Sequence, residues 1–201
     1  MSTLRPFFWA LTIASTVFGN AALSQDAYIA QVGDSNAAAN FGSGSQLFQS
    51  IVQYGASNRG AQVSAGANNA SNLAQIGLYN AALVVNLGRD NQANTAQLGL
   101  GNQAFAGILG TDNSVSTLQS GAFNRSSVSV IGDNTDVGVA QFGVAKTLSL
   151  TVYDQMVASS APASQSTADG RLRVGVIQGR NDAPVTSTIV RRPDGTIVIN
   201  P

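Results

Sequence analysis

Glycine recurs at every eleventh residue of this chain over more than half of its length, without an insertion or a deletion. The series is Gly33, Gly44, Gly55, Gly66, Gly77, Gly88, Gly99, Gly110, Gly121, Gly132 and Gly143. A fixed short period is typical of repeat architectures, in which each unit packs mainly on its two neighbours. The pattern therefore predicts a solenoid rather than an ordinary globular domain.

Two amide residues keep the same register as the glycines. Glutamine stands two residues before alternate glycines and so recurs every 22 residues, at Gln31, Gln53, Gln75, Gln97, Gln119 and Gln141. Asparagine stands three residues after most glycines, at Asn36, Asn58, Asn69, Asn80, Asn91, Asn102, Asn113 and Asn124. The half-repeat thus has the form Q-x-G-x-x-N, followed by about six further residues.

The G-x-x-N segment is interpreted as a turn, because Gly and Asn tolerate a positive φ and Asn can bond nearby backbone groups. The residues between turns alternate with period two, as in Asn91, Ala93, Thr95 and Gln97, which is typical of a strand. Two strands and two turns make one rung of 22 residues. The predicted fold class is all-β: a solenoid of two stacked parallel sheets over residues 25–153, capable of cross-β packing, plus a short C-terminal β extension.

Rungs stacked about 4.8 Å apart place Gln over Gln and Asn over Asn. Amide side chains both donate and accept, so such ladders satisfy polar groups that are costly to bury singly. We therefore expect the Gln and Asn residues, with the turn glycines Gly33, Gly55, Gly77, Gly99, Gly121 and Gly143, to form the core and the self-assembly site. The first repeat strand, residues 25–31, has no polar cap before it, and an unpaired edge of this kind is a template for linear growth.

Composition excludes several classes of function. The chain has no Cys and no His, which removes disulfides, thiol catalysis and Cys/His zinc sites. We expect no cofactor, no metal and no enzymatic activity. Asp133 and Asp136 are close in sequence, but they bracket a turn with no apolar pocket in prospect. The formal net charge is +0, so no electrostatic reason favours nucleic acid as a partner.

The N-terminal segment is typical of a secretory leader. Arg5 precedes an apolar run at residues 7–17, and small residues follow up to Ser24. Eleven apolar residues are too few to cross about 30 Å of hydrocarbon at about 1.5 Å per residue. We therefore expect residues 1–24 to be a signal peptide, and the remainder of the chain to be secreted through the periplasm.

The glycine register stops after Tyr153, and the rest divides into two parts. Residues 154–170 are rich in Ala and Ser and are predicted to be a linker. Residues 171–201 are predicted to form a basic β-hairpin extension, with strands around a turn at residues 191–195. This extension carries half of the basic residues of the chain, namely Arg171, Arg173, Arg180, Arg191 and Arg192. Two interpretations remain open: attachment to an anionic polymer of the cell surface, or a cap on the C-terminal edge.

The pattern Q-x-G-x-x-N-x-A at 22-residue spacing resembles the curlin-associated repeat of bacterial curli subunits. It is clearest at residues 31–38, 75–82 and 97–104, and the resemblance covers residues 25–153. It implies an extracellular amyloid fibre that serves adhesion and the biofilm matrix. The partners it implies are further copies of the chain, a cognate curli subunit, and an outer-membrane secretion pore.

Curli contain a major, fibre-forming subunit and a minor, nucleating subunit. The last repeat here, Gln141–Thr147, resembles a late repeat of the minor subunit, in which Lys-Thr replaces the turn Asn. The chain also lacks the Gly-rich segment that precedes the repeats of the major subunit. Against this, it continues for nearly fifty residues beyond the final repeat. The resemblance leans towards the nucleating subunit.

Two other functions fit a solenoid. A monomeric secreted solenoid can bind a surface or a carbohydrate, but such binders usually show a regular outward row on one flat face. The outward positions here are irregular, as Ala81, Leu83 and Val85 in one half and Gln92 and Asn94 in the next illustrate. A β-helical enzyme of the polysaccharide-lyase kind needs a cleft with clustered acids and bases, and the sequence contains no such cluster.

Overall fold

The computed structural model describes residues 16–17, 25–154, 171–179, 182–192 and 196–200. Most of the predicted signal peptide, nearly all of the predicted linker, and Arg180 lie outside these residues. The strands are β1 (Thr16–Val17), β2 (Gln25–Val32), β3 (Ala37–Ser45), β4 (Leu47–Ala56), β5 (Arg59–Ala67), β6 (Ala70–Leu78), β7 (Ala81–Arg89), β8 (Gln92–Leu100), β9 (Gln103–Thr111), β10 (Ser114–Ala122), β11 (Arg125–Asp133), β12 (Thr135–Val144), β13 (Thr147–Asp154), β14 (Leu172–Gln178), β15 (Val185–Arg191) and β16 (Ile197–Asn200). No helix among the described residues is long and apolar enough to span a membrane.

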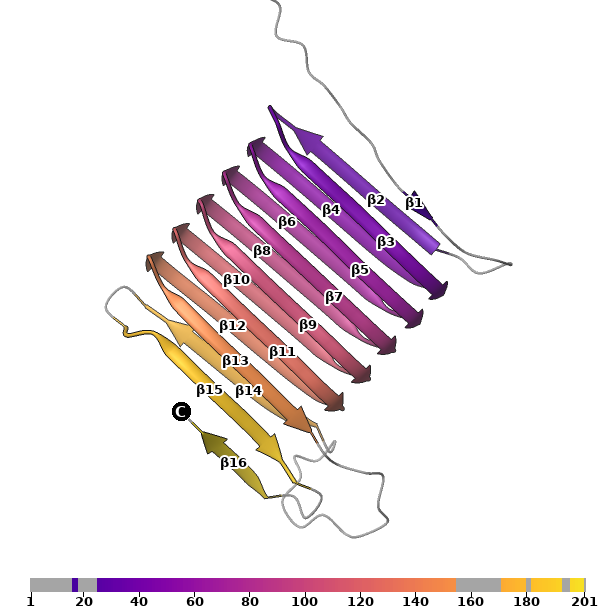
Figure 1. Ribbon diagram of the computed structural model, residues 1–201, viewed down its shortest axis with the longest axis vertical. Helices are drawn as coiled ribbons and strands as arrows, with labels where there is room; N and C mark the ends of the chain where they lie inside the picture. The colour runs from indigo at the N-terminus through magenta and orange to yellow at the C-terminus, as the bar shows by residue number, and fades with distance from the viewer. Residues whose placement is uncertain (1–15, 18–24, 155–170, 180–181, 193–195, 201) are drawn as a thin grey trace, which may run out of the picture.

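The strands stack into two sheets that face each other (Figure 1). The odd-numbered strands and β16 form a nine-stranded sheet in the order β1-β3-β5-β7-β9-β11-β13-β15-β16. The even-numbered strands from β2 to β14 form a seven-stranded sheet in chain order. From β2 to β15 each strand pairs in parallel with the strand two places along the chain. The predicted fold class, a β-solenoid of strand–turn–strand rungs with two parallel sheets, is confirmed.

The register between rungs is constant. Gln75 faces Gln97 and Gly77 faces Gly99, and the same offset of 22 residues holds from β2 to β13. Because parallel in-register strands superpose equivalent side chains, the eleven-residue period of the sequence becomes columns of identical residues in space.

The stack continues beyond the last glycine of the series. β14 pairs in parallel with β12, where Gln141 faces Gln178, and β15 pairs in parallel with β13. These two strands form a further rung, where the sequence interpretation ended the solenoid at Tyr153. β16 then pairs with β15 in antiparallel orientation, as expected for the C-terminal hairpin.

The turn glycines are required by both backbone conformation and space. Gly99, at the centre of the stack, has φ +118, and a Cβ built there would lie 1.9 Å from the carbonyl oxygen of Gly121 in the next rung. The same approach, within about 2 Å, recurs between consecutive glycines of each column. Any side chain at these positions would therefore push the rungs apart.

The turns depart from expectation at one position. Positive φ falls on the residue just before the turn Asn, and not on the Asn itself; examples are Ser57 with φ 57 and Asp90 with φ 55. The Asn side chain instead bonds backbone groups of its own rung and of the neighbouring rungs.

The space between the sheets is filled by the alternate residues of each strand, as the period-two pattern predicts. In β8, Ala93, Thr95 and Gln97 are buried. The narrow core holds more polar residues towards the N-terminal end, around a small apolar cluster of Ile29, Ile51, Leu73, Ala82 and Ala104, and more aliphatic residues towards the C-terminal end. The larger aliphatic cluster contains Val115, Val128, Val130, Val137, Val139, Leu148, Leu150, Val152, Leu172 and Ile189 among others.

Candidate self-assembly site

The predicted glutamines form one continuous hydrogen-bonded column inside the stack. Gln31 Nε2 donates to Gln53 Oε1 at 2.6 Å, and the same bond joins each following pair at 2.6–2.9 Å up to Gln141. The second Nε2 hydrogen of the inner members donates to a backbone carbonyl, as from Gln97 to Ala81 O at 3.0 Å. Both hydrogens of each of these buried amides are thus bonded.

The column has one more member than the sequence pattern showed. Gln141 Nε2 donates to Gln178 Oε1 at 2.7 Å. Gln178 lies 37 residues after Gln141, so it falls outside the period of 22 residues. One signal was present: Leu172, Val174 and Val176 alternate and end in Gln178, much as Val137 and Val139 lead to Gln141.

The predicted asparagines form a second column at the turn after each of these glutamines. Asn58 Nδ2 donates to the carbonyl of Gly77 in the next rung at 2.9 Å, and Asn58 Oδ1 accepts from Asn80 N at 3.1 Å. Equivalent bonds link Asn36, Asn58, Asn80, Asn102 and Asn124. Each Asn therefore holds the same glycine carbonyl that leaves no room for a Cβ. A shorter column of Asn69, Asn91 and Asn113 does the same at the opposite turn.

Both columns end in substitutions at the C-terminal side. Lys146 takes the place of the next Asn: its backbone N donates to Asn124 Oδ1 at 3.0 Å, and its Nζ donates to Asp182 O at 2.9 Å. At the opposite turn, Thr135 follows Asn113. Asp154 takes the place of the next glycine, since its carbonyl oxygen is what a Cβ on Gly132 would meet at 2.2 Å.

The Asp154 carboxylate is buried and forms an ion pair with Arg191. Arg191 Nε donates to Asp154 Oδ1 at 2.9 Å, and Arg191 Nη2 donates to Asp154 Oδ2. The Arg191 side chain is 7% exposed and the Asp154 side chain 0% exposed. Thr135 Oγ1 adds a hydrogen bond to Asp154 Oδ2 at 3.3 Å. This pair fixes the end of β15 to the end of β13.

A second ionic contact fixes β14. Arg171 Nη1 lies 2.8 Å from Asp112 Oδ2, and Arg171 Nη2 lies 2.7 Å from Asp136 Oδ1. The hydrogen bonds to Asp136, more than those to Asp112, raise the pKa of Arg171 and outweigh the opposing effect of burial. Arg173 Nε lies 3.6 Å from Asp136 Oδ2 but is mostly exposed. The described arginines Arg171, Arg173 and Arg191 thus contact acids of their own chain, while Arg192 N donates to Thr196 O across the hairpin.

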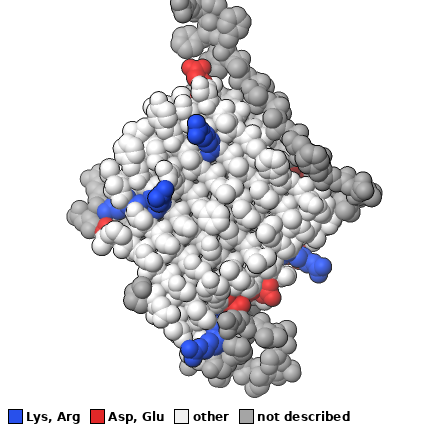
Figure 2. All heavy atoms as spheres, viewed as in Figure 1, with Lys and Arg blue, Asp and Glu red and all other residues white. Residues whose placement is uncertain are grey.

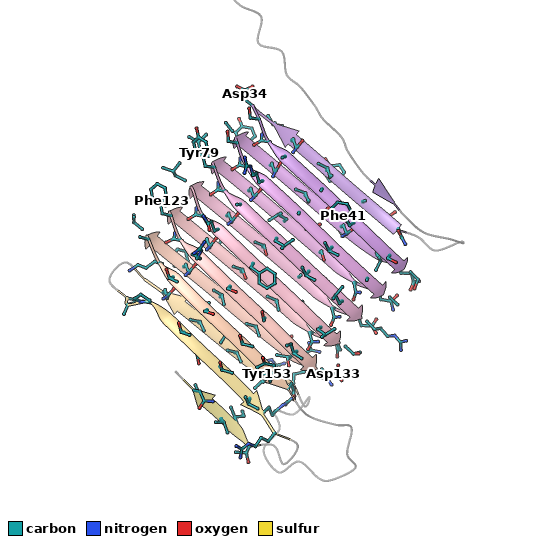
Figure 3. The ribbon with its side chains drawn as sticks, in the orientation of Figure 1. Asp34, Phe41, Tyr79, Phe123, Asp133 and Tyr153 are labelled. Carbon is teal, nitrogen blue, oxygen red and sulfur yellow. The ribbon has the colours of Figure 1, made fainter. Side chains whose placement is uncertain are left out.

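The two turn edges of the stack differ in polarity. On the edge after the glutamines, the left-handed position is occupied twice by an exposed aromatic residue: Tyr79, with φ 58, is 65% exposed and Phe123, with φ 56, is 60% exposed. The exposed large hydrophobic residues of this edge are Val32, Tyr54, Ile76, Leu78, Tyr79, Leu98, Leu100, Phe123, Phe142 and Val144. Figure 3 places Tyr79 and Phe123 on the same side of the ribbon as Asp34.

On the opposite edge, the left-handed position is occupied by polar residues, namely Gln46, Asn68, Asp90, Asp112 and Asn134. The exposed large hydrophobic residues of this edge are fewer: Leu109, Ile131 and Tyr153. Asp133 lies on this side in Figure 3. The face of the stack seen in Figure 2 carries few charged side chains. Among the described residues, no group of three His, Cys, Asp or Glu side chains is placed to hold a metal ion.

The comparisons with known proteins agree with this geometry over one segment. Residues 110–143 match the family model described as the curlin associated repeat. The matched segment contains β10 and β11 and nearly all of β12, with Gln119 and Gln141 of the amide column and Asn124 of the turn column. No curated protein and no solved structure matches the chain. The resemblance to the curlin-associated repeat is therefore supported by a family match at residues 110–143, and by the solenoid fold around it.

Proposed function

We propose that this protein is a structural subunit of an extracellular curli-type amyloid fibre that serves surface adhesion and the biofilm matrix. The observation that carries the proposal is the constant parallel register of 22 residues, which stacks identical buried amides from Gln31 to Gln141. A rung of another chain can continue the glutamine column, because each inner rung presents the same side-chain donor and acceptor to the next. The match of residues 110–143 to the curlin associated repeat supports it.

The proposed route to the surface follows from the sequence. Residues 1–24 act as the signal peptide, and the mature chain leaves the periplasm through an outer-membrane secretion pore. Its fibre partners are copies of itself and a cognate curli subunit. Its role is structural, without catalysis or a cofactor. We assign it a nucleating role ahead of a purely fibre-forming one, because its final repeat ends in Lys146-Thr147 in place of the turn Asn.

The proposed self-assembly is tested with the mature chain, residues 25–201. We expect thioflavin T fluorescence to rise after a lag, the lag to shorten on addition of preformed seeds, and electron microscopy to show unbranched fibres. Fibre diffraction should give the strand spacing of about 4.8 Å. A chain that stays monomeric and β-rich and never binds the dye would contradict the proposal.

The amide column is tested with two substitutions that add the same charge to the same strand. Gln97→Glu places a carboxylate in the buried column and should prevent seeded growth, because a column of amides leaves an anion without enough donors. Gln92→Glu, at an exposed position of β8, is the matched control and should seed normally. The nucleating role is tested by adding the mature chain at low ratio to its cognate subunit, whose lag should shorten.

One observation favours the alternative, a monomeric solenoid that binds a surface or a carbohydrate. β16 lies beside β15 and occupies one of the two strand positions that a further rung would need. If β16 never leaves that position, the chain remains a monomer. Sedimentation of the mature chain after prolonged incubation separates the two functions.

A further inference from the structure

We infer that β16 is an autoinhibitory strand, which occupies the docking place of β3 from a second copy of this chain and must leave before that copy can add. This inference rests on the proposed self-assembly, and it concerns the control of that same surface. It identifies the docking surface as the rung β14–β15, and the partner as the rung β2–β3 of another copy.

The two sheets end at different strands at the C-terminal end of the stack (Figure 1). The seven-stranded sheet ends at β14, whereas the nine-stranded sheet continues past β15 to β16. An incoming rung consists of β2 for one sheet and β3 for the other, and the edge of β3 that β1 pairs with is available in the mature chain, which begins at residue 25. Among the described residues, no strand pairs with the outer side of β14, so β2 can dock there, but the place beside β15 is filled by β16.

β16 runs antiparallel to its neighbour β15. Every strand pair from β2 to β15 within a sheet is parallel, whereas Val190 faces Val198 in an antiparallel pair. A parallel strand cannot continue the columns on β16, because an antiparallel neighbour reverses the order of the side chains. β16 therefore blocks the register as well as the position.

The amide column ends at Gln178, whose two Nε2 hydrogens are both bonded to backbone carbonyls. Gln178 Nε2 donates to Thr147 O at 3.0 Å and to Ala183 O at 2.9 Å. In the inner rungs one of these hydrogens goes to the next glutamine instead, as from Gln119 to Gln141 Oε1 at 2.8 Å. Addition of another chain thus requires Gln178 to exchange its bond to Ala183 O for one to Gln31 Oε1 of the newcomer.

The last two strands of the nine-stranded sheet, β15 and β16, differ in their burial and in the contacts that attach them to the stack. β15 is fixed by the buried pair Asp154–Arg191 and by Ile189, which is 8% exposed. β16 pairs at four positions, and two of its three apolar residues remain exposed: Ile197 is 51% and Ile199 is 63% exposed, while Val198 is partly buried. A short strand with little burial can open without the rest of the stack. β16 has the properties of a gate, and β15 those of a fixed end.

The test uses a redox-controlled lock in the full mature chain. The sequence contains no Cys, so Val190→Cys with Val198→Cys introduces one possible disulfide, between facing residues of β15 and β16. Facing Cα atoms of an antiparallel hydrogen-bonded pair lie about 5.5 Å apart, which suits a disulfide. The reduced form of the same protein is the matched control. The converse variant is Val198→Pro, which removes a backbone donor from β16, with Val198→Thr as its control.

We expect the oxidised lock to slow seeded elongation by roughly tenfold or more relative to the reduced form, the effect of closing a gate worth about 1.4 kcal/mol. Val198→Pro should shorten the lag, while Val198→Thr should not. Equal elongation of the oxidised and reduced forms would overturn the inference and leave the proposed fibre function intact.

A binding measurement separates the gate from fibre formation. A fluorescent peptide of residues 25–45, which spans β2 and β3, should bind the reduced chain and the Val198→Pro variant and should not bind the oxidised lock. This result supports the gate even if no variant forms fibres. The absence of fibres in all variants would contradict only the proposed fibre function. Equal binding of the peptide to the oxidised and reduced forms contradicts the gate.

Discussion

The first three rungs and the last three rungs share one backbone and one register but are stabilised by different means. The N-terminal rungs bury many polar side chains between the sheets, including Asn40, Gln49, Gln62, Ser64 and Ser71. The equivalent space in the C-terminal rungs is filled by aliphatic residues such as Val128, Val139 and Leu150. The same turn and glycine pattern therefore specifies the path of the chain, while the inward residues decide how stable each rung is.

The polar half contains amide groups that are incompletely bonded. The buried side-chain amide oxygens without a hydrogen-bond partner belong to Gln25, Asn40, Gln62 and Asn86, all within the first three rungs of the described stack. A buried acceptor without a partner costs about 1–3 kcal/mol. Among the parallel rungs, excluding the antiparallel β16, the N-terminal rung is therefore the least stable, and the opening of whole rungs should begin there.

The largest expected loss of stability comes from substituting a turn glycine at the centre of the stack, where the polar and aliphatic halves meet. Gly99→Ala forces a Cβ to within 1.9 Å of Gly121 O at φ +118, so we expect the free energy of unfolding to fall by about 5 kcal/mol from strain and overpacking together. Urea unfolding followed by circular dichroism measures the loss. Gly138→Ala is the control, since nothing lies within 4 Å of a Cβ there. Equal stability of both variants would show that the rungs can separate freely.

The next effect tests the fixed end of the apolar half. Asp154→Ala removes the carboxylate that pairs with the buried Arg191 and should lower the free energy of unfolding by about 4 kcal/mol. Arg173→Ala removes an exposed contact to Asp136 and should change it by less than about 1 kcal/mol. Thermal unfolding of the two variants side by side gives the comparison, and a similar shift in both would argue against a special role for the buried pair.

A matched pair of leucines compares the two cores directly. Leu150→Ala, within the aliphatic cluster, should lower the free energy of unfolding by about 3 kcal/mol. Leu73→Ala, in the smaller apolar cluster with Ile51 and Ala82 and in a strand that also buries Ser71 and Gln75, should cost about 2 kcal/mol. Denaturant titrations with equal m-values make the two figures comparable. A larger loss at Leu73 would reverse the proposed order of stability.

The smallest expected effect is an increase in the free energy of unfolding, caused by replacing an incompletely bonded buried amide. Gln62 Oε1 has no hydrogen-bond partner, and Gln62 Nε2 donates only to Ser50 O at 3.2 Å. Gln62→Leu should therefore raise the free energy of unfolding by about 1 kcal/mol. Gln75→Leu breaks the amide column on both sides and should instead destabilise. Hydrogen exchange of β4 to β7 checks both, with slower exchange expected only for Gln62→Leu.

Much of this structure follows from the spacing of glycine, glutamine and asparagine. The period of eleven with its doubling to 22 predicts two sheets, the parallel register and the inward side of each strand, because a rigid repeat leaves no freedom in pairing. The seventh rung escaped prediction because 17 residues separate Asp154 from Leu172 and Asp154 replaces the expected glycine. The place of β16 depends on which sheet ends first, and no local pattern encodes that.

The two turn edges have a consequence for how a long stack meets its surroundings. Rung-by-rung addition would repeat the exposed aromatic residues Tyr79 and Phe123 along one edge of the rod, once in every added chain, while the left-handed positions of the opposite edge stay polar. Such a rod is amphipathic along its whole length. It should therefore adsorb with its aromatic edge towards air or oil at an interface with water. Films of these rods would then grow two-dimensionally along the boundary.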